Sequence, residues 1–462
     1  MQNTHPPQNW GDRLARYPFL SSLRGRRSRR FGAGMTIPGG PLAYRSRFKP
    51  IPLAKDEEAA LAFAACGITG YALADLCYEP GQGGNIMAGL VGRSIASGDG
   101  IQTVALVVTN DEATYLLKRP QDFAPAEIRE LIELGEKGAF TELYLRSRIK
   151  IKEGRAAPPT TPLFNINANQ WSAHASGNTC FLPINDLTCM YINGLLEIFN
   201  ETTGAFVLDE RAGYRPAGLE RFARRKGGHL EDDPSRGRAV TVRQVEMLVA
   251  EFVAVEQGMM LQNLGLMTQA LGLGGWPSFA NHEFGWFQAL GFRLGEMPAS
   301  RYLGAGRLTT LAMNLLKRNP PVPYPLGLER DGQVLLKPFC PPYYPSMTAA
   351  VQAVVEAKFG SRGIFRRSDS ENAWTDSTGV IKKIAPLSDA TIAATTAYCN
   401  YLWDTYGRFP AHLAPYRTVL VYQANHLDVE FYERFYRPEA LTETQAEDFA
   451  RWRHTNWTVS SQ

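Results

Sequence analysis

The sequence predicts a folded protein of the α+β class, with helices and strands around a large core. Three observations support this prediction. Of the 462 residues, 44% are apolar and 20% are charged, which is typical of a soluble, folded chain. Residues 101–109 read IQTVALVVT, and their β-branched side chains predict a buried strand. Residues 240–273 form the longest helical pattern, which is apolar on most sides and predicts a helix buried all round.

The composition excludes two classes of protein. No apolar stretch reaches the roughly 18 residues of a membrane-spanning helix, and the N-terminus lacks the apolar run of a secretory signal. The cysteines are scattered without a CxxC pair, so neither a disulfide framework nor a zinc knuckle is expected. We therefore expect a cytoplasmic protein with reduced thiols at Cys66, Cys77, Cys180, Cys189, Cys340 and Cys399.

Local patterns place the remaining elements. Asp56 opens a helical run that extends through Leu76, and residues 125–138 predict another helix. Residues 334–337 predict a short strand. We expect five segments: a flexible N-terminus (1–20), the first part of the core (21–150), an insertion or subdomain with one helix near 186–199 (151–239), the second part of the core (240–344), and a helical, aromatic-rich C-terminal segment (345–462).

Positive charge is concentrated at the N-terminus. Residues 1–50 hold ten Lys and Arg against one acid, whereas the other 412 residues hold 39 against 44. Five arginines fall within residues 24–30, and they repel one another unless an anion compensates them. Three interpretations follow: a solvated basic tail, a contact with nucleic acid or anionic lipid, or a clamp for a cofactor phosphate, which the arginine fork and Ser28 suit.

Two further stretches are rich in glycine. Residues 92–102 read GRSIASGDGIQ, where small residues allow backbone N–H groups to approach a ligand, although such a stretch is more often a structural turn. Residues 271–277 read LGLGGWP and end the long helix. Gln262 and Asn263 precede that end, and buried amides there need hydrogen-bond partners.

In this order, the three motifs resemble the FMN-dependent nitroreductase family, and they are most similar to its branch that oxidises peptide azolines. The family's Arg-x-Ser-x-Lys/Arg phosphate motif corresponds to residues 26–30. Its Pro-Ser-Ser/Ala-x-Asn-x-Gln loop corresponds to residues 96–102, but Ala96 replaces the proline and Gly100 the asparagine. Its Gln-Asn…Leu-Gly-Leu-Gly helix end corresponds to residues 262–274.

The resemblance covers about half of the chain, residues 22–140 and 240–340, and it implies a fold. That fold has a central antiparallel or mixed sheet flanked by helices, and a long buried helix that pairs with its counterpart in a homodimer. Residues 322–328 would form the last core strand. The insertion and the C-terminal segment have no counterpart in the short nitroreductases.

The resemblance also implies a cofactor, FMN, with NAD(P)H as its ordinary reductant. Residues from all three motifs would bind it: Arg26, Arg27, Ser28, Arg30 and Lys337 at the phosphate, and Ser97, Gly98, Gln102, Gln262, Asn263, Gly274 and Gly275 along the ribityl chain or the ring. No residue is predicted to be catalytic, because the flavin carries the hydride or the electrons.

Two functions remain open at this point. The first is an FMN-dependent oxidoreductase that acts on a small or peptide-derived organic substrate. The alternative is a non-catalytic or flavin-transforming protein of the same fold, whose basic N-terminal arm binds a nucleic acid or another anionic partner. The acidic balance of the remaining chain argues against nucleic acid, and no membrane partner is expected.

Other candidates have a more ordinary explanation. His426 and Glu430 would share one face of a helix and could begin a metal site, but a hydrogen-bonded histidine at a helix start is the better interpretation, and no metal is predicted. Cys340 could have a redox role. The aromatic residues at 398–436 are interpreted as core, with a lid over a flat substrate as the alternative.

Overall fold

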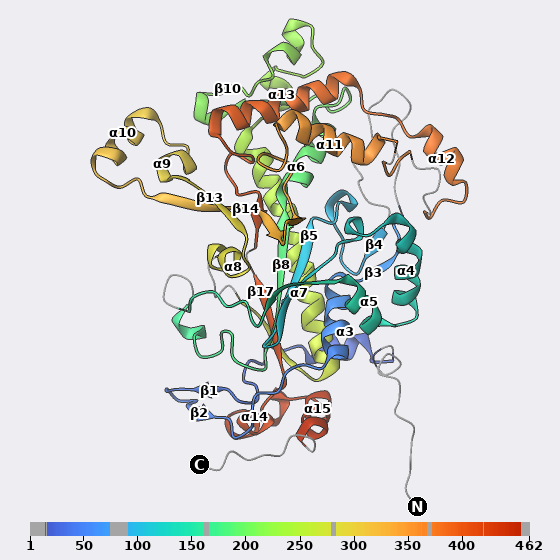
Figure 1. Ribbon diagram of the computed structural model, residues 1–462, viewed down its shortest axis with the longest axis vertical. Coiled ribbons are helices and arrows are strands. Elements are labelled where there is room, and N and C mark those ends of the chain that lie inside the picture. Colours follow the sequence, from blue (N-terminus) through green and yellow to red (C-terminus); the bar gives the residue numbers. More distant parts are fainter. Residues whose placement is uncertain are drawn as a thin grey trace, which may run out of the picture.

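The centre of the molecule is an antiparallel sheet of seven strands (Figure 1). The structure, a computed structural model, describes residue 14 and residues 16–73, 91–160, 166–278, 283–361, 363–366, 372–418 and 420–453. Six strands follow the order β12-β17-β8-β5-β6-β7, and β16 also pairs with β8. Their bounds are β5 (Val104–Thr109), β6 (Ala113–Leu117), β7 (Arg148–Glu153), β8 (Thr179–Asp186), β12 (Gly274–Ser278), β16 (Tyr416–Arg417) and β17 (Val421–Asn425).

Strand β5 confirms the predicted buried strand, since all six of its residues are buried. Its side chains alternate between the two faces of the sheet, as the two-residue period of a strand requires. Val104, Leu106 and Val108 pack against helices α3 (Lys55–Cys66) and α7 (Val242–Leu271). Val107 points to the other face, where α8 (Glu283–Ala289) packs with Trp286 and Phe287.

A helical layer forms the upper part of the molecule in Figure 1. Helices α6, α11 and α13 pack there against the N-terminal half of α7. Tyr398, Tyr406 and Phe409 are buried in this layer, so the interpretation as core is confirmed for these three residues, whereas Tyr436 of the same range is 45% exposed. The helices concerned are α6 (Leu187–Ile198), α11 (Met347–Phe359), α12 (Ser377–Lys383) and α13 (Asp389–Tyr406).

The expected last core strand lies elsewhere. β14 (Pro321–Arg330) pairs with β13 (Arg293–Pro298) and β15 (Gln333–Leu336), outside the central sheet. Its N-terminal half pairs on one side only, so Pro323 and Pro325, which have no N–H, cost it no ladder bond on the open side. Together with α9 (Ala299–Tyr302) and α10 (Arg307–Leu315), β13 and β14 form an arm that protrudes from the body (Figure 1). We call residues 293–330 the arm.

Two segments expected outside the core contribute to its centre. Strand β8 lies in the stretch expected to be an insertion, yet it pairs with β5, β16 and β17. Strand β17 lies in the segment expected to be helical, and it takes the place next to β12. Both strands are completely buried, so burial in the finished sheet decides their structure.

Strands β1 and β2 and helices α14 and α15 lie together at the base of the molecule (Figure 1). Phe31 stacks on Phe431 with their ring centroids 4.2 Å apart, and Phe48 packs on Trp452. The prediction of a flexible N-terminus falls mostly outside the described residues, but Phe19 already begins a helix. The elements here are α2 (Phe19–Gly25), β1 (Thr36–Ile37), β2 (Tyr44–Arg45), α14 (Val429–Phe435) and α15 (Glu443–Arg453).

The remaining elements are short. They are β3 (Ile68–Tyr71), β4 (Val91–Arg93), α4 (Ile128–Glu136), α5 (Phe140–Ser147), β9 (Phe206–Asp209), β10 (Arg215–Pro216) and β11 (Ala239–Thr241). Helix α4 and strand β15 confirm the predicted helix at 125–138 and the predicted short strand. The five described cysteines are free thiols. Within the described residues, every helix is too short or too polar to cross a bilayer.

Helix α3 ends earlier than the pattern predicts, at Cys66 rather than Leu76. Gly67 follows, and a Cβ atom built there would lie 2.2 Å from the ring of Phe63. That ring stacks on Phe140 at a centroid distance of 4.2 Å, so a Cβ atom at residue 67 would have to push it out of this contact. Only glycine fits, and the chain leaves the helix into β3.

We predict that Gly67→Ala lowers the free energy of unfolding by about 1–3 kcal/mol, because it overpacks a fixed aromatic pair. Urea titration followed by circular dichroism measures this change. Gly39→Ala is the matched control, since a Cβ there meets nothing within 4 Å. Equal stability of both variants would contradict the steric explanation.

Candidate functional site

Five of the predicted cofactor residues line one cavity of about 230 Å³. It lies between the chain after α2, the C-terminal half of α7 and the adjacent strands β12 and β17. We call it the arginine cavity. Its lining residues are Arg26, Arg27, Ser28, Gly258, Leu261, Gln262, Gly265, Gly275, Pro277, Leu420 and Tyr422.

Arg29 fixes the segment that carries the first three residues. Its buried guanidinium donates hydrogen bonds to Gln269 Oε1 (2.9 Å) and to the carbonyl oxygens of Ala440 (2.7 Å) and Gly25 (3.2 Å). Its backbone forms a bridge with Gly275 of β12. The preceding residues are thereby held at the edge of the cavity, with their side chains exposed.

The two arginines at the cavity carry uncompensated charge. Among the described residues, no carboxylate pairs with Arg26 or Arg27, and Nη1 of Arg27 donates to the carbonyl oxygens of Arg24 (3.2 Å) and Arg26 (3.0 Å). Ser28 adds a hydroxyl to the same wall. Two cations and a hydroxyl without an anion are suited to bind a phosphate.

Glycines shape the inner wall of this cavity. A Cβ at Gly275 would lie 2.3 Å from the hydroxyl of Tyr422, which is hydrogen-bonded to Thr268 Oγ1 at 2.8 Å. Burial raises the pKa of Tyr422, so this phenol stays neutral. At Gly258 a Cβ would meet nothing within 4 Å, so this position is open. The predicted glycine at the helix end is therefore required by close packing on a tyrosine.

Three predicted residues are turned away from the cavity. Arg30 lies between the rings of Trp171 and Trp276 and donates to Asn169 Oδ1 (2.7 Å) and Ser172 Oγ (2.8 Å). These hydrogen bonds hold Nη2 of Arg30 inside the protein, and Arg30 does not line the arginine cavity. The other two residues are Asn263, which donates to the carbonyl oxygens of Ala64 and Ser94, and Gly274, which packs against Leu427 and Asn425.

The stretch at residues 92–102, which we call the Ser-Gly loop, also forms hydrogen bonds within the protein. Ser97 Oγ donates to Glu256 and accepts from the backbone N–H of Gln102 at 2.9 Å. The Gln102 amide donates to the carbonyl oxygen of Val91 at 3.2 Å. Within one copy of the chain these residues, with Gly98, do not reach the arginine cavity. Glu256, which the sequence did not suggest, is buried and holds this loop on α7.

Lys337 lies apart from the predicted phosphate site. Together with Gln102 it lines a second cavity, of about 570 Å³, bounded by α4, α6, α11 and β15. Its ammonium lies 4.8 Å from the ring centroid of Tyr344. Within one copy of the chain Lys337 does not join Arg26, because residues 322–328 belong to the arm and not to the central sheet.

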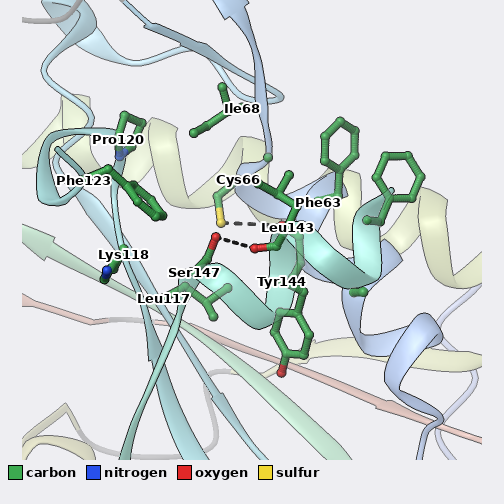
Figure 2. A pocket seen from close by; sticks show the side chains of 14 residues that line it. Phe63, Cys66, Ile68, Leu117, Lys118, Pro120, Phe123, Leu143, Tyr144 and Ser147 are labelled. Carbon is green, nitrogen blue, oxygen red and sulfur yellow. Dashed lines mark hydrogen bonds between the residues drawn. The ribbon is translucent and has the colours of Figure 1, made fainter. Parts of the chain in front are cut away.

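The remaining small pocket is packing space. Figure 2 shows it between α3, β3 and α5, where the side chains of Phe63, Cys66 and Leu143 converge. Its volume of about 30 Å³ holds roughly two water molecules. The Cys66 thiol donates to the carbonyl oxygen of Ala62, and Ser147 donates to that of Leu143. Nothing in this pocket suggests chemistry.

Sequence reasoning did not predict three residues that line the arginine cavity: Gly258, Gly265 and Tyr422. The two glycines are seven residues apart, which is about two helical turns, so they lie on the same face of α7. This spacing could have indicated a face without side chains. Tyr422 had no such signal, because it comes from a strand about 150 residues further along the chain. Cys340 is buried, and burial raises its pKa, so the thiol is protonated and a redox role is not supported.

A buried charge cluster joins the chain end to α3. His426 Nδ1 lies 2.9 Å from Asp448, and its Nε2 lies 3.2 Å from Glu57. Arg451 pairs with both carboxylates, so two cations balance two anions and a metal ion is not needed. Glu430, the partner suggested by helical spacing, pairs with Arg47 instead. The hydrogen-bonded histidine is confirmed, with different partners.

Comparison with known proteins does not assign this chain to a family. No protein-family model matches the sequence, and no curated protein matches it. One similar solved structure is a protein from Ralstonia eutropha JMP134 that is provisionally described as a nitroreductase. It is 11% identical, and the alignment covers 59% of this chain and 75% of that one, with a TM-score of 0.28. A TM-score this low does not establish a common fold.

We predict that the cluster at His426 makes stability depend on pH. Burial disfavours the imidazolium, but the hydrogen bonds that it donates to the carboxylates of Asp448 and Glu57 outweigh this and raise the pKa of His426 to about 10, from 6.5. The stabilisation is thus complete below pH 6.5 and is lost as the pH rises toward 10. His426→Gln should lower the free energy of unfolding by at least about 2 kcal/mol at pH 6, and by less at pH 10.

Urea titrations between pH 6 and pH 10 measure this difference. His412→Gln is the control, because burial and neighbouring arginines lower the pKa of His412 to about 4 and leave it neutral over that range. The difference between the wild type and this control variant should stay constant. A constant difference for His426→Gln as well would refute the charge cluster.

Proposed function

We propose that the arginine cavity binds the phosphate of FMN and that the protein is an FMN-dependent oxidoreductase with a nitroreductase-like fold. One observation supports this most: Arg26 and Arg27 have no carboxylate partner among the described residues, yet they border a cavity together with Ser28. An arginine fork matches two phosphate oxygens, and a serine hydroxyl can donate to a third.

The other walls of the cavity suit the rest of the ligand. Gly265 leaves room for close approach, since a Cβ there would meet no atom nearer than 3.8 Å. Leu261 offers an apolar contact, and the exposed amide of Gln262 lies at the rim. When bound, FMN takes up and returns a hydride or electrons. The part of this chain is to bind the phosphate, to orient the ring and to exclude water around it.

One copy of the chain does not enclose the whole cofactor. Ligand pockets usually measure about 300–1,000 Å³, and the arginine cavity has about 230 Å³. It opens on a face of α7 that was expected to be buried. On that face Met247, Leu248, Phe252 and Val255 are 44–58% exposed. Such an apolar stripe on a core helix indicates a partner, and we propose a second copy.

An antiparallel pair of α7 helices would complete both sites. If the helices cross at Gly258, which has open space around it, Phe252 of each copy comes opposite the region of Gly265 in the other. Gly98 packs beside Phe252, since a Cβ at Gly98 would lie 3.5 Å from its ring. In this way the Ser-Gly loop of one copy would reach the arginine cavity of the other.

For the substrate we propose a small or peptide-derived organic molecule, and for the reductant NAD(P)H. Both proposals rest on the resemblance of the three motifs. The alternative, a non-catalytic or flavin-transforming protein that uses the same arginines for another anion, differs in what the purified protein binds and turns over.

We predict that Arg26→Ala and Arg27→Ala each weaken FMN binding at least about 10-fold, because each removes a charge-assisted bond to phosphate of about 1.5–3 kcal/mol. Quenching of FMN fluorescence measures the affinity. Riboflavin, which lacks the phosphate, should bind equally to both variants and the wild type. Arg45→Ala, at an exposed arginine on β2, should leave FMN affinity unchanged.

Two results would reject this proposal. A wild type that takes up neither FMN nor riboflavin has no flavin site. Equal loss of riboflavin and FMN in the variants would show that the arginines do not contact the phosphate. Uptake of another phosphorylated ligand, with no uptake of FMN, would favour the non-catalytic alternative.

We predict that Val255→Glu converts a dimer into a monomer, because it places a charge in the apolar stripe of α7. Val255 is 58% exposed in one copy, so the fold itself should tolerate the change. Sedimentation velocity measures the association. Leu145→Glu, at an exposed leucine of α5, is the control and should stay dimeric. A dimeric Val255→Glu variant would show that α7 is not the pairing surface.

A further inference from the structure

We propose that the second cavity, which Lys337 lines, binds a small organic anion: a carboxylate with an apolar body. This inference rests neither on the flavin nor on the pairing of two copies. The volume of the cavity, about 570 Å³, lies within the range of about 300–1,000 Å³ that is usual for ligand pockets. We call it the lysine cavity. Three features support the proposal: its apolar walls, its two lysines and the internal partners of its acids.

Apolar side chains from separate parts of the chain form the walls of the lysine cavity. Val91 comes from β4 and Ile128 from α4. Leu335 comes from β15 and Val354 from α11. In Figure 1, α11 belongs to the upper helical layer, and β4 and α4 lie below it. A cavity of this size with apolar walls favours a ligand that has an apolar body.

Two lysines bring positive charge to the lysine cavity. Lys337 is exposed, and no carboxylate of the described residues pairs with its ammonium, which lies 4.8 Å from the ring centroid of Tyr344. Lys358 of α11 is only 2% exposed, and it donates to Asn193 Oδ1 at 2.9 Å. Both lysines line the cavity. An ammonium forms a charge-assisted hydrogen bond with a carboxylate, so these two residues favour an anionic ligand.

The two acids that line the lysine cavity have partners within the chain. Asp122 accepts two hydrogen bonds from Arg119, at 3.0 Å from Nε and 3.1 Å from Nη2. Asp186 Oδ1 accepts from the backbone N–H and the hydroxyl of Thr188, at 2.8 and 2.6 Å. These contacts begin helices or turns, so neither acid is provided for a ligand.

The balance of charge favours a carboxylate over a phosphate. With Arg119 and Asp122 paired, two lysines stand against one acid, which leaves one positive charge in the lining. A carboxylate neutralises this charge, whereas a phosphate monoester, with a charge of about −1.5 to −2, exceeds it. Lysine is also a point charge and lacks the fork with which arginine binds phosphate. The lysine cavity and the arginine cavity therefore suit different anions.

Isothermal titration calorimetry of the full chain with naphthoate tests the proposal. We expect naphthoate to bind, and we expect naphthylmethanol, a neutral compound of similar shape, to bind at least about 5-fold more weakly. Lys337→Met removes one positive charge and should weaken naphthoate binding at least about 5-fold without changing the affinity for naphthylmethanol. Lys152→Met, at an exposed lysine of β7, is the matched control and should bind both compounds as the wild type does.

Two further variants locate the ligand. Ala357 is an exposed residue of α11 that lines the lysine cavity, so Ala357→Phe narrows the cavity from its edge. It should weaken the binding of both compounds at least about 10-fold, whereas Ala357→Ser should not. Lys358→Met should abolish the preference for naphthoate over naphthylmethanol. Binding of the alcohol by this variant shows that the cavity is intact.

Four results would overturn the inference. A wild type that binds neither compound has no ligand site in this cavity, and equal affinity for both would show that the lysines do not recognise an anion. Naphthoate binding that Ala357→Phe leaves unchanged would place the ligand elsewhere. Naphthyl phosphate that binds more tightly than naphthoate, and loses this binding in Ala357→Phe, would assign the cavity to phosphates.

The flavin proposal is tested separately, with FMN and the arginine variants. If those variants bind FMN as the wild type does, the flavin proposal fails and the lysine cavity is unaffected. If Lys337→Met weakens FMN binding and leaves naphthoate binding unchanged, this lysine belongs to the flavin site and the present inference fails.

Discussion

The buried guanidinium of Arg29 joins three distant parts of the chain. Among the described residues no carboxylate pairs with it, and it donates to Gln269 at the end of α7, to the carbonyl oxygen of Ala440 near the C-terminus and to that of Gly25 in α2. Burial lowers its pKa, but the hydrogen bonds to these oxygens hold the cation in place. Because this residue fixes the N-terminal segment on β12, the arginines before it border a cavity instead of moving freely.

Helix α7 links the core to the proposed assembly. One side carries Val253, Met260 and Leu264 into the core, and a buried polar network through Glu256 holds the Ser-Gly loop on it. The other side carries an apolar stripe, open glycine positions and one wall of the arginine cavity. A single helix thus supports the sheet, the candidate cofactor site and the surface through which a second copy would complete that site.

The candidate site was predictable only in part. Residues 26–28, Gln262 and Gly275 come together because the sheet places the start of the chain beside the end of α7, as the motif order suggested. Gln102 and Lys337 do not join them within one copy. The Gln102 amide is held by the carbonyl oxygen of Val91. Lys337 follows β15, which pairs with β14 outside the central sheet, and it lines another cavity.

The sequence by itself determined the elements whose pattern is local. The β-branched run of β5, the long apolar run of α7 and the arginine cluster need no distant partner to be recognised. Only the tertiary structure decided that β8 and β17 are central strands, that one face of α7 stays open and that His426 pairs with Asp448 and Glu57. The physical reason is that burial and hydrogen-bond partners come from residues far apart in the chain, and a local pattern does not contain them.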